Sequence, residues 1–415
     1  MFDVQCSMFY NFLSMRIALV SQEYPPETAK GGIGTQTFLK AHGLAALGHD
    51  VHVISRSLDG KYSTRDDNNV HVTRIPGLES RMQIYTEVAD WLGYSAEVAT
   101  AVAALHAKSP LDVVDFPEWG AEGYVHLLNR TEWNRVPTVI HLHGPLVMFA
   151  HTMGWPELDS EFYRTGTAME GACVRLADAV FSSSKCSADW CAKYYGRNRD
   201  EIPVLHTGVD MELFSPRDVP KAKRPTIIFA GKLARNKGVH LLAEAAVRLV
   251  KEIPGLQLRL LGRGEPKILD ELNNLAQSAD APDLLDAPGF VNRTELPEHF
   301  SRAHVFAAPS EYEGGPGFVY LEAMACGLPV IACTGSGAAE VVRQNENGVL
   351  VPPRDVEALT AALRSLLNDN LLREKMGAFA RQFVLAEADS RACIKKLESF
   401  YAAVVNGALK NKITR

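Results

Sequence analysis

Short apolar runs rich in β-branched residues alternate with longer amphipathic stretches along this chain, and the alternation starts twice. In the first half we expect a helix over 35–47 and strands at 16–21, 50–55, 113–116, 138–143, 179–183 and 203–206. The pattern resumes with helices over 239–251 and 318–326 and with strands at 226–230, 256–261, 304–308 and 329–333. Such alternation is typical of parallel sheets covered by helices on both faces. The sequence therefore predicts an α/β chain with two doubly wound, Rossmann-like domains.

The length of 415 residues agrees with two domains, because one hydrophobic core rarely organises more than about 250–300 residues. A polar stretch rich in proline and lysine, 211–224, separates the two patterns and is interpreted as a linker. We expect a disordered extension over 1–14, one domain over 15–210, a second over 225–386 and a terminal segment over 387–415. Because the first strand pattern follows Met15 directly, Met15 stays an alternative to Met1 as the start of translation.

The composition narrows the class of protein. A net charge of -6 argues against a nucleic-acid partner, since such proteins normally carry a basic excess. The seven cysteines include no CxxC pair and are interpreted as reduced thiols in a reducing compartment. No apolar run reaches the roughly 18–20 residues of a membrane span, and the first residues lack the basic region of a signal peptide. We therefore expect a cytoplasmic protein.

Glycines follow the first expected strand in the sequence Gly31-Gly32-Ile33-Gly34. Small residues there allow backbone N–H groups to approach a phosphate or a sugar, although a flexible loop explains the glycines equally well. The spacing does not match the dinucleotide fingerprint, and no acidic residue closes the second strand, which disfavours an NAD enzyme. The chain also lacks GxxxxGK[ST], which excludes a P-loop nucleotidase.

A histidine and two lysines follow other expected strands. His141 and His143 share one face of their strand, and only His143 reaches its carboxyl end, where ligands bind in open parallel sheets. Lys232 and Lys237 flank the start of the second domain's first helix, where two ammonium groups and oriented N–H donors suit a pyrophosphate. Solvated surface lysines and a structural histidine are the alternative interpretation.

The most informative stretch runs from Glu313 through a glycine-rich loop to Glu322 in the helix that follows. Two carboxylates placed in this way can hold two hydroxyl-bearing parts of one ligand while loop amides contact its phosphates. A general acid and base pair, as in a glycosidase, would use the same two residue types. The residue pattern by itself does not distinguish a ligand-binding pair of carboxylates from a general acid and base pair.

In this order the motifs resemble glycosyltransferase family 4, which includes bacterial mannosyltransferases, sucrose-phosphate synthases and cell-envelope glycosyltransferases. The resemblance runs from about Arg16 to the C-terminus and rests on PPETAKGGIG, IHLHG, HTGVDMELFSP, GKLARNKGV and EGGPGFVYLEAMACGLPVIA. It implies a GT-B fold, with an N-terminal acceptor domain and a C-terminal nucleotide-sugar domain facing across a cleft. It also implies that a C-terminal helix, marked by Leu397, Phe400, Tyr401 and Val404, crosses back to the first domain.

The resemblance also implies roles for individual residues. His143 is expected beside the donor sugar, Lys232 and Lys237 at the donor diphosphate, Glu313 at the sugar hydroxyls and Glu322 at the ribose. The implied catalytic residues are His143, Lys237 and Glu313, and the donor site is completed by Gly32, Gly314, Gly315, Gly317 and Phe318. The chain departs from the family by having Lys232 where arginine is common, and by one extra position between its two glutamates, so that Glu311 is a further candidate.

The function implied is a retaining glycosyltransferase that moves a hexose from a nucleotide-diphosphate sugar, UDP-glucose being favoured. The acceptor is expected to be a glycan, a lipid-linked sugar or a small sugar, with contacts from Glu118 and Trp119, although a core role for Trp119 stays open. The resemblance implies that no metal or other cofactor is needed, and the chain agrees with this in lacking a DxD motif. Peripheral association with the inner face of the membrane stays open. The alternatives are an epimerase or phosphorylase of the same architecture, and a non-catalytic subunit that binds nucleotide sugar.

Overall fold

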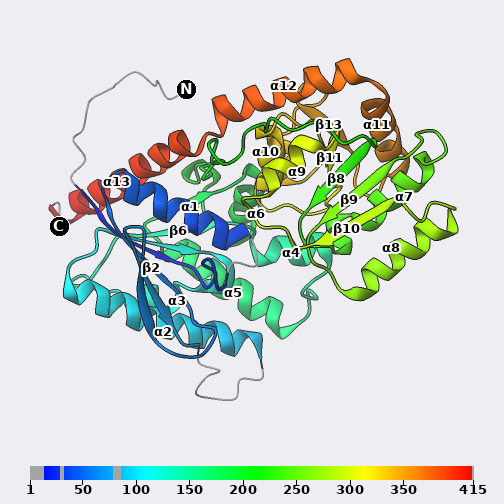
Figure 1. Ribbon diagram of the computed structural model, residues 1–415. Coiled ribbons are helices and arrows are strands. Elements are labelled where there is room, and N and C mark those ends of the chain that lie inside the picture. The colour runs from blue at the N-terminus through cyan, green and yellow to red at the C-terminus, as the bar shows by residue number, and fades with distance from the viewer. Residues whose placement is uncertain (1–13, 29–31, 78–85, 414–415) are drawn as a thin grey trace. The chain divides into compact units, whose positions relative to one another are not determined.

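The computed structural model describes residues 14–28, 32–77 and 86–413, and the chain folds into two compact units (Figure 1). The first unit runs up to His141 and adds residues 172–180 and 396–415, while the second contains 142–171 and 181–395. The extension expected over 1–14 lies outside the described residues apart from Ser14. The domain boundaries inferred from the sequence stay a prediction.

The first sheet has the strand order β3-β4-β2-β1-β5-β6-β7. Its strands are β1 (Arg16–Val20), β2 (Asp50–Arg56), β3 (Ser63–Asp67), β4 (Val70–Ile75), β5 (Val113–Pro117), β6 (Thr138–Leu142) and β7 (Ala179–Ser182). Figure 1 shows α1 (Gly32–Ala46) and α2 (Glu87–Lys108) on opposite sides of this sheet. Every residue of β5 and of β6 is buried, as expected of strands covered on both faces.

Two sequence-based expectations for this half were wrong, and the strands β3 and β4 were not predicted. The segment 203–206 makes only a single bridge, between Ser182 and Val204, and is not a strand of the sheet. The helix expected over 35–47 begins earlier, at Gly32, because part of the glycine run is helical. The edge strand β3 was missed, since its sequence STRDD has no apolar alternation, and it pairs antiparallel with β4.

The second sheet is parallel, with the order β10-β9-β8-β11-β12-β13. Its strands are β8 (Thr226–Ala230), β9 (Gln257–Leu261), β10 (Leu285–Gly289), β11 (Val305–Ala307), β12 (Val330–Cys333) and β13 (Gly348–Val351). The flanking helices are α7 (Val239–Leu249), α8 (Pro266–Ser278), α9 (Leu296–Arg302), α10 (Phe318–Ala325), α11 (Val356–Asn368) and α12 (Asn370–Glu387). Helix α7 packs on α11, and α10 packs on α12.

Further helices of the first half are η2 (Trp119–Ala121), α3 (Tyr124–Leu128), α4 (Leu146–Met153), α5 (Glu161–Leu176) and α6 (Lys185–Tyr195). None of the helices in the described ranges combines the length and apolarity needed to cross a membrane. The six described cysteines are free thiols, and five of them are buried, as the sequence predicts.

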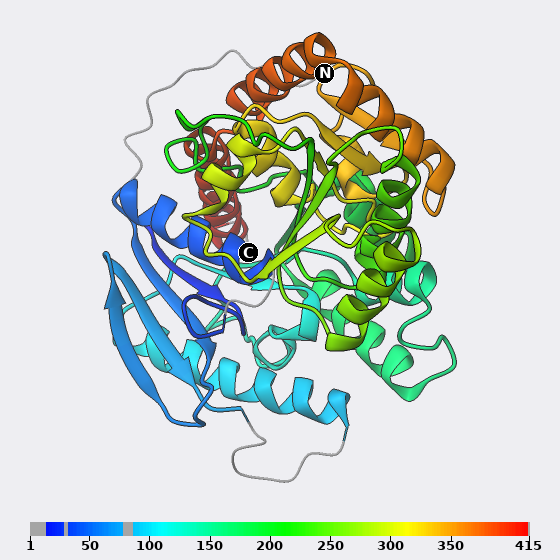
Figure 2. The ribbon, with the colours of Figure 1, turned by 45° about the vertical axis from the view of Figure 1, so that its right-hand side comes forward.

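The last helix, α13 (Ser390–Ile413), belongs to the first unit from residue 396 on, and Figures 1 and 2 show it beside α1. Leu397 and Tyr401 are buried, whereas Phe400 and Val404 are half-buried. Glu398 pairs with His49 Nε2 at 2.9 Å, and the Tyr401 hydroxyl donates to Asp115 on β5. The expectation that the C-terminal helix returns to the first domain is confirmed.

Candidate active site

The loop between β11 and α10 holds the glycine-rich sequence, and close backbone contacts explain why its glycines are needed. A Cβ on Gly314 would lie 2.4 Å from the backbone oxygen of His143. A Cβ on Gly337 would lie 2.0 Å from the backbone oxygen of Gly315, and the Gly337 N–H donates to Glu313 O at 2.8 Å. Gly317 has a φ of 65°, in the left-handed region that favours glycine, and it directly precedes α10, which begins at Phe318. The structure thus places His143 beside Gly314.

Helix α6 holds the same loop from its own N-terminus. The side-chain hydroxyls of Ser184 and Ser187 both donate to the carbonyl oxygen of Gly314, the second at 2.6 Å. The backbone N–H groups of Lys185 and Cys186 bind the Glu340 carboxylate, each at 2.8 Å. The positive end of α6 is therefore satisfied by a side chain of the protein itself. These contacts fix the shape of the glycine-rich loop.

Lys237 and Glu313 form the central ion pair of this region. Lys237 ends the short helix η4 (Arg235–Lys237), and its Nζ lies 2.7 Å from Glu313 Oε1. Gly238, with a φ of 72°, then starts α7 in close contact with Pro309, where a Cβ would meet the Pro309 oxygen at 2.2 Å. Both charged side chains are mostly shielded, with exposed fractions of 29% and 16%. The ion pair therefore holds a cation and a hydrogen-bond acceptor side by side in a partly accessible position.

Lys232 lies in the loop after β8 and is exposed. Within the described part of the chain it forms no ion pair, so its ammonium group is available to an anion. Lys232 precedes η4 and Lys237 is its last residue, and of the two only Lys237 is paired with a carboxylate. A diphosphate site at these lysines stays a prediction.

Glu322 lies in α10, one turn after Phe318, and is 6% exposed. Arg293 donates to its Oε1 from Nε at 3.0 Å and from Nη2 at 2.7 Å. Its other oxygen has no hydrogen-bond partner among the described residues. Burial raises the pKa of the Glu322 carboxyl, and Arg293 opposes this shift. The sequence pattern gave no sign of Arg293, since only the fold brings its loop to α10.

Glu311, the further carboxylate near the loop, is already engaged. Arg354 donates to its Oε2 from Nε at 2.8 Å and from Nη2 at 2.7 Å. The ion pair with Lys237 is instead formed by Glu313. Of these two carboxylates, Glu313 is therefore the one joined to a predicted donor-site lysine.

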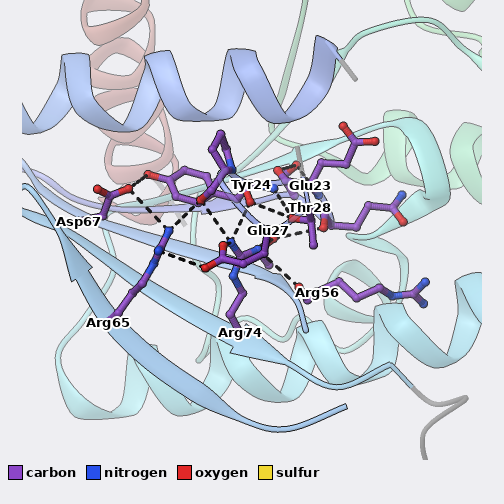
Figure 3. Close-up of polar contacts among 12 residues, drawn as sticks. Glu23, Tyr24, Glu27, Thr28, Arg56, Arg65, Asp67 and Arg74 are labelled. Carbon is purple, nitrogen blue, oxygen red and sulfur yellow. Dashed lines mark hydrogen bonds and ion pairs between the residues drawn. The ribbon is translucent and has the colours of Figure 1, made fainter. Parts of the chain in front are cut away.

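Gly32 belongs to the first unit, where it is the first residue of α1. A Cβ at this position would meet nothing within 4 Å, so the backbone is open on that side. Residues 29–31, including Gly31, lie outside the described residues. The described part of the preceding loop, up to Thr28, is held by a network of polar contacts (Figure 3).

Arg74, buried on β4, organises that network, as Figure 3 shows. Its guanidinium donates to Tyr24 O at 2.8 Å and to Thr28 Oγ1 at 3.0 Å, and it pairs with Glu27. Arg65 donates to Pro25 O at 2.8 Å. A planar group with several donors can satisfy many carbonyls of an irregular loop at once. The sequence analysis missed both arginines, because neither belongs to a recognisable motif.

Comparisons with known proteins identify the family. The model of Glycosyltransferase Family 4 matches residues 30–213, and that of Glycosyl transferases group 1 matches residues 210–383. A GDP-mannose-dependent alpha-(1-6)-phosphatidylinositol monomannoside mannosyltransferase of Mycolicibacterium smegmatis is 30% identical over 282 residues, which cover 62% of this chain and 72% of that protein. The chain belongs to glycosyltransferase family 4.

Two further similar proteins match nearly the whole length of this chain. The glycogen synthase of Mycobacterium tuberculosis is 29% identical over 407 residues, which cover 95% of this chain and 96% of the relative. The solved sucrose-phosphate synthase from Thermosynechococcus elongatus superposes with a TM-score of 0.79 at 24% identity, covering 94% of this chain and 99% of that one. The two α/β domains thus have the GT-B fold, and the predicted family and fold are confirmed.

The predicted acceptor residues of the glycosyltransferase follow β5 in the first unit. Glu118 is fully buried, and its backbone N–H donates to His141 O at 3.1 Å. Trp119 is half-buried and packs edge-on against Trp91, with 5.7 Å between the ring centroids. Glu118 is therefore shielded from solvent, whereas Trp119 is only partly shielded. Their role at an acceptor stays a prediction.

Glu122, four residues further on, is a buried carboxylate that the sequence analysis missed. Its Oε1 accepts the N–H of Gln22 at 3.1 Å, whereas its Oε2 is buried without a hydrogen-bond partner in the part of the chain described. Burial raises the pKa of Glu122 from 4.5 to about 8, against the opposing effects of the Gln22 N–H and Arg56. In the sequence, Glu122 is marked only as the third acidic residue of the segment DFPEWGAEG, which does not indicate that it is buried.

We expect the unfolding free energy of this glycosyltransferase to fall as the pH rises through about 8, because of Glu122. Its folded-state pKa is raised, so its stabilising contribution is complete below the unfolded pKa and is lost as the folded carboxyl ionises. Urea unfolding at several pH values between about 5 and about 8.5 would measure the slope. In Glu122→Gln, which cannot ionise, this part of the slope should vanish. An unchanged slope in the variant would show that other groups cause it.

Proposed function

We propose that this chain is a retaining transferase that moves a hexose from a nucleotide-diphosphate sugar, with UDP-glucose as the first candidate, to a sugar acceptor. The observation that carries the proposal is the Lys237–Glu313 pair at 2.7 Å, which joins η4 to the glycine-rich loop, with Lys232 exposed in the loop before η4. Transfer leaves a nucleoside diphosphate, whose departure requires positive charge and N–H donors that are already in place.

Each predicted site residue has a task in this reaction. Lys232 and Lys237 neutralise the diphosphate, and Glu313 accepts hydrogen bonds from the sugar hydroxyls while it orients Lys237. Glu322 Oε2 accepts hydrogen bonds from the ribose, with Arg293 holding the carboxylate through Oε1. His143 contacts the sugar from the segment that packs on Gly314. We propose that the leaving phosphate accepts the acceptor's proton during attack from the same face of the sugar.

The two lysines supply the positive charge that a divalent cation supplies in other transferases, and we propose that transfer requires no metal. The relative matched over nearly its whole length is named a glycogen synthase, which favours a glucosyl donor. A second relative is named GDP-mannose-dependent, so GDP-mannose is the competing donor. For the acceptor we propose a glycan, a lipid-linked sugar or a small sugar phosphate bound by the loop that carries Trp119.

The test is a matrix of donors and acceptors with and without EDTA. UDP-glucose, ADP-glucose and GDP-mannose are each incubated with malto-oligosaccharides, inositol phosphate or a lipid-linked sugar, and nucleoside diphosphate release and the product's anomeric configuration by NMR are recorded. We expect release with one donor family, an α-linked product from an α-linked donor, and no loss with EDTA. A new nucleotide sugar formed without acceptor would instead identify an epimerase, and a strict metal requirement would overturn the proposal.

Glu322→Gln tests the donor site within the same assay. Loss of a charged hydrogen-bond acceptor costs about 1.5–3 kcal/mol, so the donor KM should rise roughly 10- to 100-fold. Glu311→Gln is the matched control, because Glu311 is also paired with an arginine but has no assigned ligand contact. Equal donor KM values for the two variants would remove Glu322 from the site.

A further inference from the structure

Two histidines and an aspartate gather on neighbouring strands of the first sheet, outside the proposed donor site. Asp50 and His52 stand two positions apart on β2 and so point to the same face. His71 is the register partner of His52 on the parallel strand β4. Asp50 is the first residue of β2, so the cluster lies at the amino ends of these strands. The loop leading to Gly32 follows the carboxyl end of β1, so it lies at the opposite ends of these parallel strands.

The distances between the possible ligand atoms of these three residues are close to those between the ligands of a bound metal ion. Asp50 Oδ1 lies 2.9 Å from His52 Nε2 and 3.7 Å from His71 Nε2. All three residues offer a ligand atom within 4.8 Å of the others. A tetrahedral Zn²⁺ with bonds of about 2.0–2.1 Å places neighbouring ligand atoms about 3.3 Å apart. The two distances from the aspartate fall on either side of that value.

Neighbouring side chains orient the possible ligand atoms of the cluster. His52 Nε2 is buried and has no hydrogen-bond partner of good geometry among the described residues. His71 Nδ1 lies 2.5 Å from Asp66 Oδ1, and Asp66 is its register partner on β3. A carboxylate on one ring nitrogen fixes the tautomer that directs the lone pair of the other nitrogen to a metal. Arg16 binds Asp50 through Oδ2, which leaves Oδ1 facing the histidines.

We propose that Asp50, His52 and His71 form a binding site for a transition-metal cation of the Zn²⁺ class, with water in the fourth position. Asp66 is a positioning residue that orients His71. Imidazole nitrogens select zinc, copper, nickel or cobalt over magnesium and calcium. A bound cation would join β2 to β4 and, through Asp66, to the edge strand β3, so it would stabilise the sheet without taking part in glycosyl transfer.

The experiment uses the full chain after EDTA treatment and dialysis. Calorimetric titration with Zn²⁺ should show one equivalent bound, and Co²⁺ should give the visible absorption of a four-coordinate site. His52→Ala and His71→Ala should lose both signals, and Asp66→Asn should weaken Zn²⁺ binding roughly tenfold. His151→Ala is the matched control, because His151 is exposed and belongs to a different unit, and it should bind as the wild type does.

Zn²⁺ should also raise the melting temperature of the wild type and of His151→Ala, but not of His71→Ala. His71 is half exposed on the sheet surface, so its replacement should leave the circular dichroism spectrum unchanged, and His71→Gln gives a second variant of similar size. The absence of Zn²⁺ binding by the wild type would overturn the proposal. Retention of full affinity in both histidine variants would overturn it as well, since the cation would then bind elsewhere.

Discussion

Lys237→Ala is expected to lower the turnover number about 10²- to 10³-fold, which is the usual effect of removing one pre-positioned charge or donor from a transition-state site. The ammonium group of Lys237 lies 2.7 Å from Glu313, so its position is fixed before any ligand binds. We propose that it meets the negative charge that develops on the leaving diphosphate. Initial rates of nucleoside diphosphate release with the preferred donor would measure the loss.

Arg235→Ala is the matched control for this change. Arg235 lies on the same short helix, is also paired with a glutamate, Glu271, and has a side chain that is 62% exposed. Its removal should leave turnover close to that of the wild type. Lys237→Arg should recover part of the activity, because it restores the charge without the same reach. Equal rates for Lys237→Ala and Arg235→Ala would contradict the assigned role.

Lys40→Met is expected to destabilise the protein by about 3–5 kcal/mol, the usual cost of removing one partner from a buried ion pair. Lys40 Nζ lies 2.8 Å from Asp115 Oδ2, and the exposed fractions of the two side chains are 4% and 1%. The variant leaves the Asp115 carboxylate buried with the Tyr401 hydroxyl and no cation at this distance. The shift in the urea unfolding curve would measure the loss.

A double variant separates the ion pair from simple packing. Lys40→Met combined with Asp115→Leu removes both charges, and it should recover much of the stability, because two apolar groups of similar size tolerate burial. Arg302→Met breaks an exposed pair with Glu298 and serves as the surface control, for which little change is expected. If Lys40→Met unfolded at the same urea concentration as Arg302→Met, the buried pair would contribute nothing to stability.

The segments of the proposed donor site were predictable because their backbone requirements are local. The glycines of the EGGPGF loop and the start of α10 at Phe318 follow from short-range backbone rules. The expected strands before Lys232 and before His143 were also found, as β8 and β6. Chain position at the end of a strand is enough to bring such residues to the ligand-binding edge of a sheet.

Long-range partners were not predictable from one sequence. Arg293 reaches Glu322 from 29 positions away, and Arg74 reaches Tyr24 from 50 positions away. Neither arginine was singled out from the sequence, since β10, the strand that precedes Arg293, and β4, which carries Arg74, were not predicted. The polar strand β3 and the buried Glu122 were missed for the same reason, since an exposed-looking sequence gives no sign of its neighbours.

The α/β class, the glycine-rich loop and the family could be inferred from consecutive residues, because apolar periodicity and strand-end motifs are local properties. Which charges pair became visible only in the folded chain: Lys237 with Glu313, Glu322 with Arg293 and Lys40 with Asp115. The tertiary structure also decided which carboxylate is buried enough for its pKa to rise, as at Glu122. The physical reason is that ion pairing and desolvation depend on distances of a few ångströms between segments far apart in the chain.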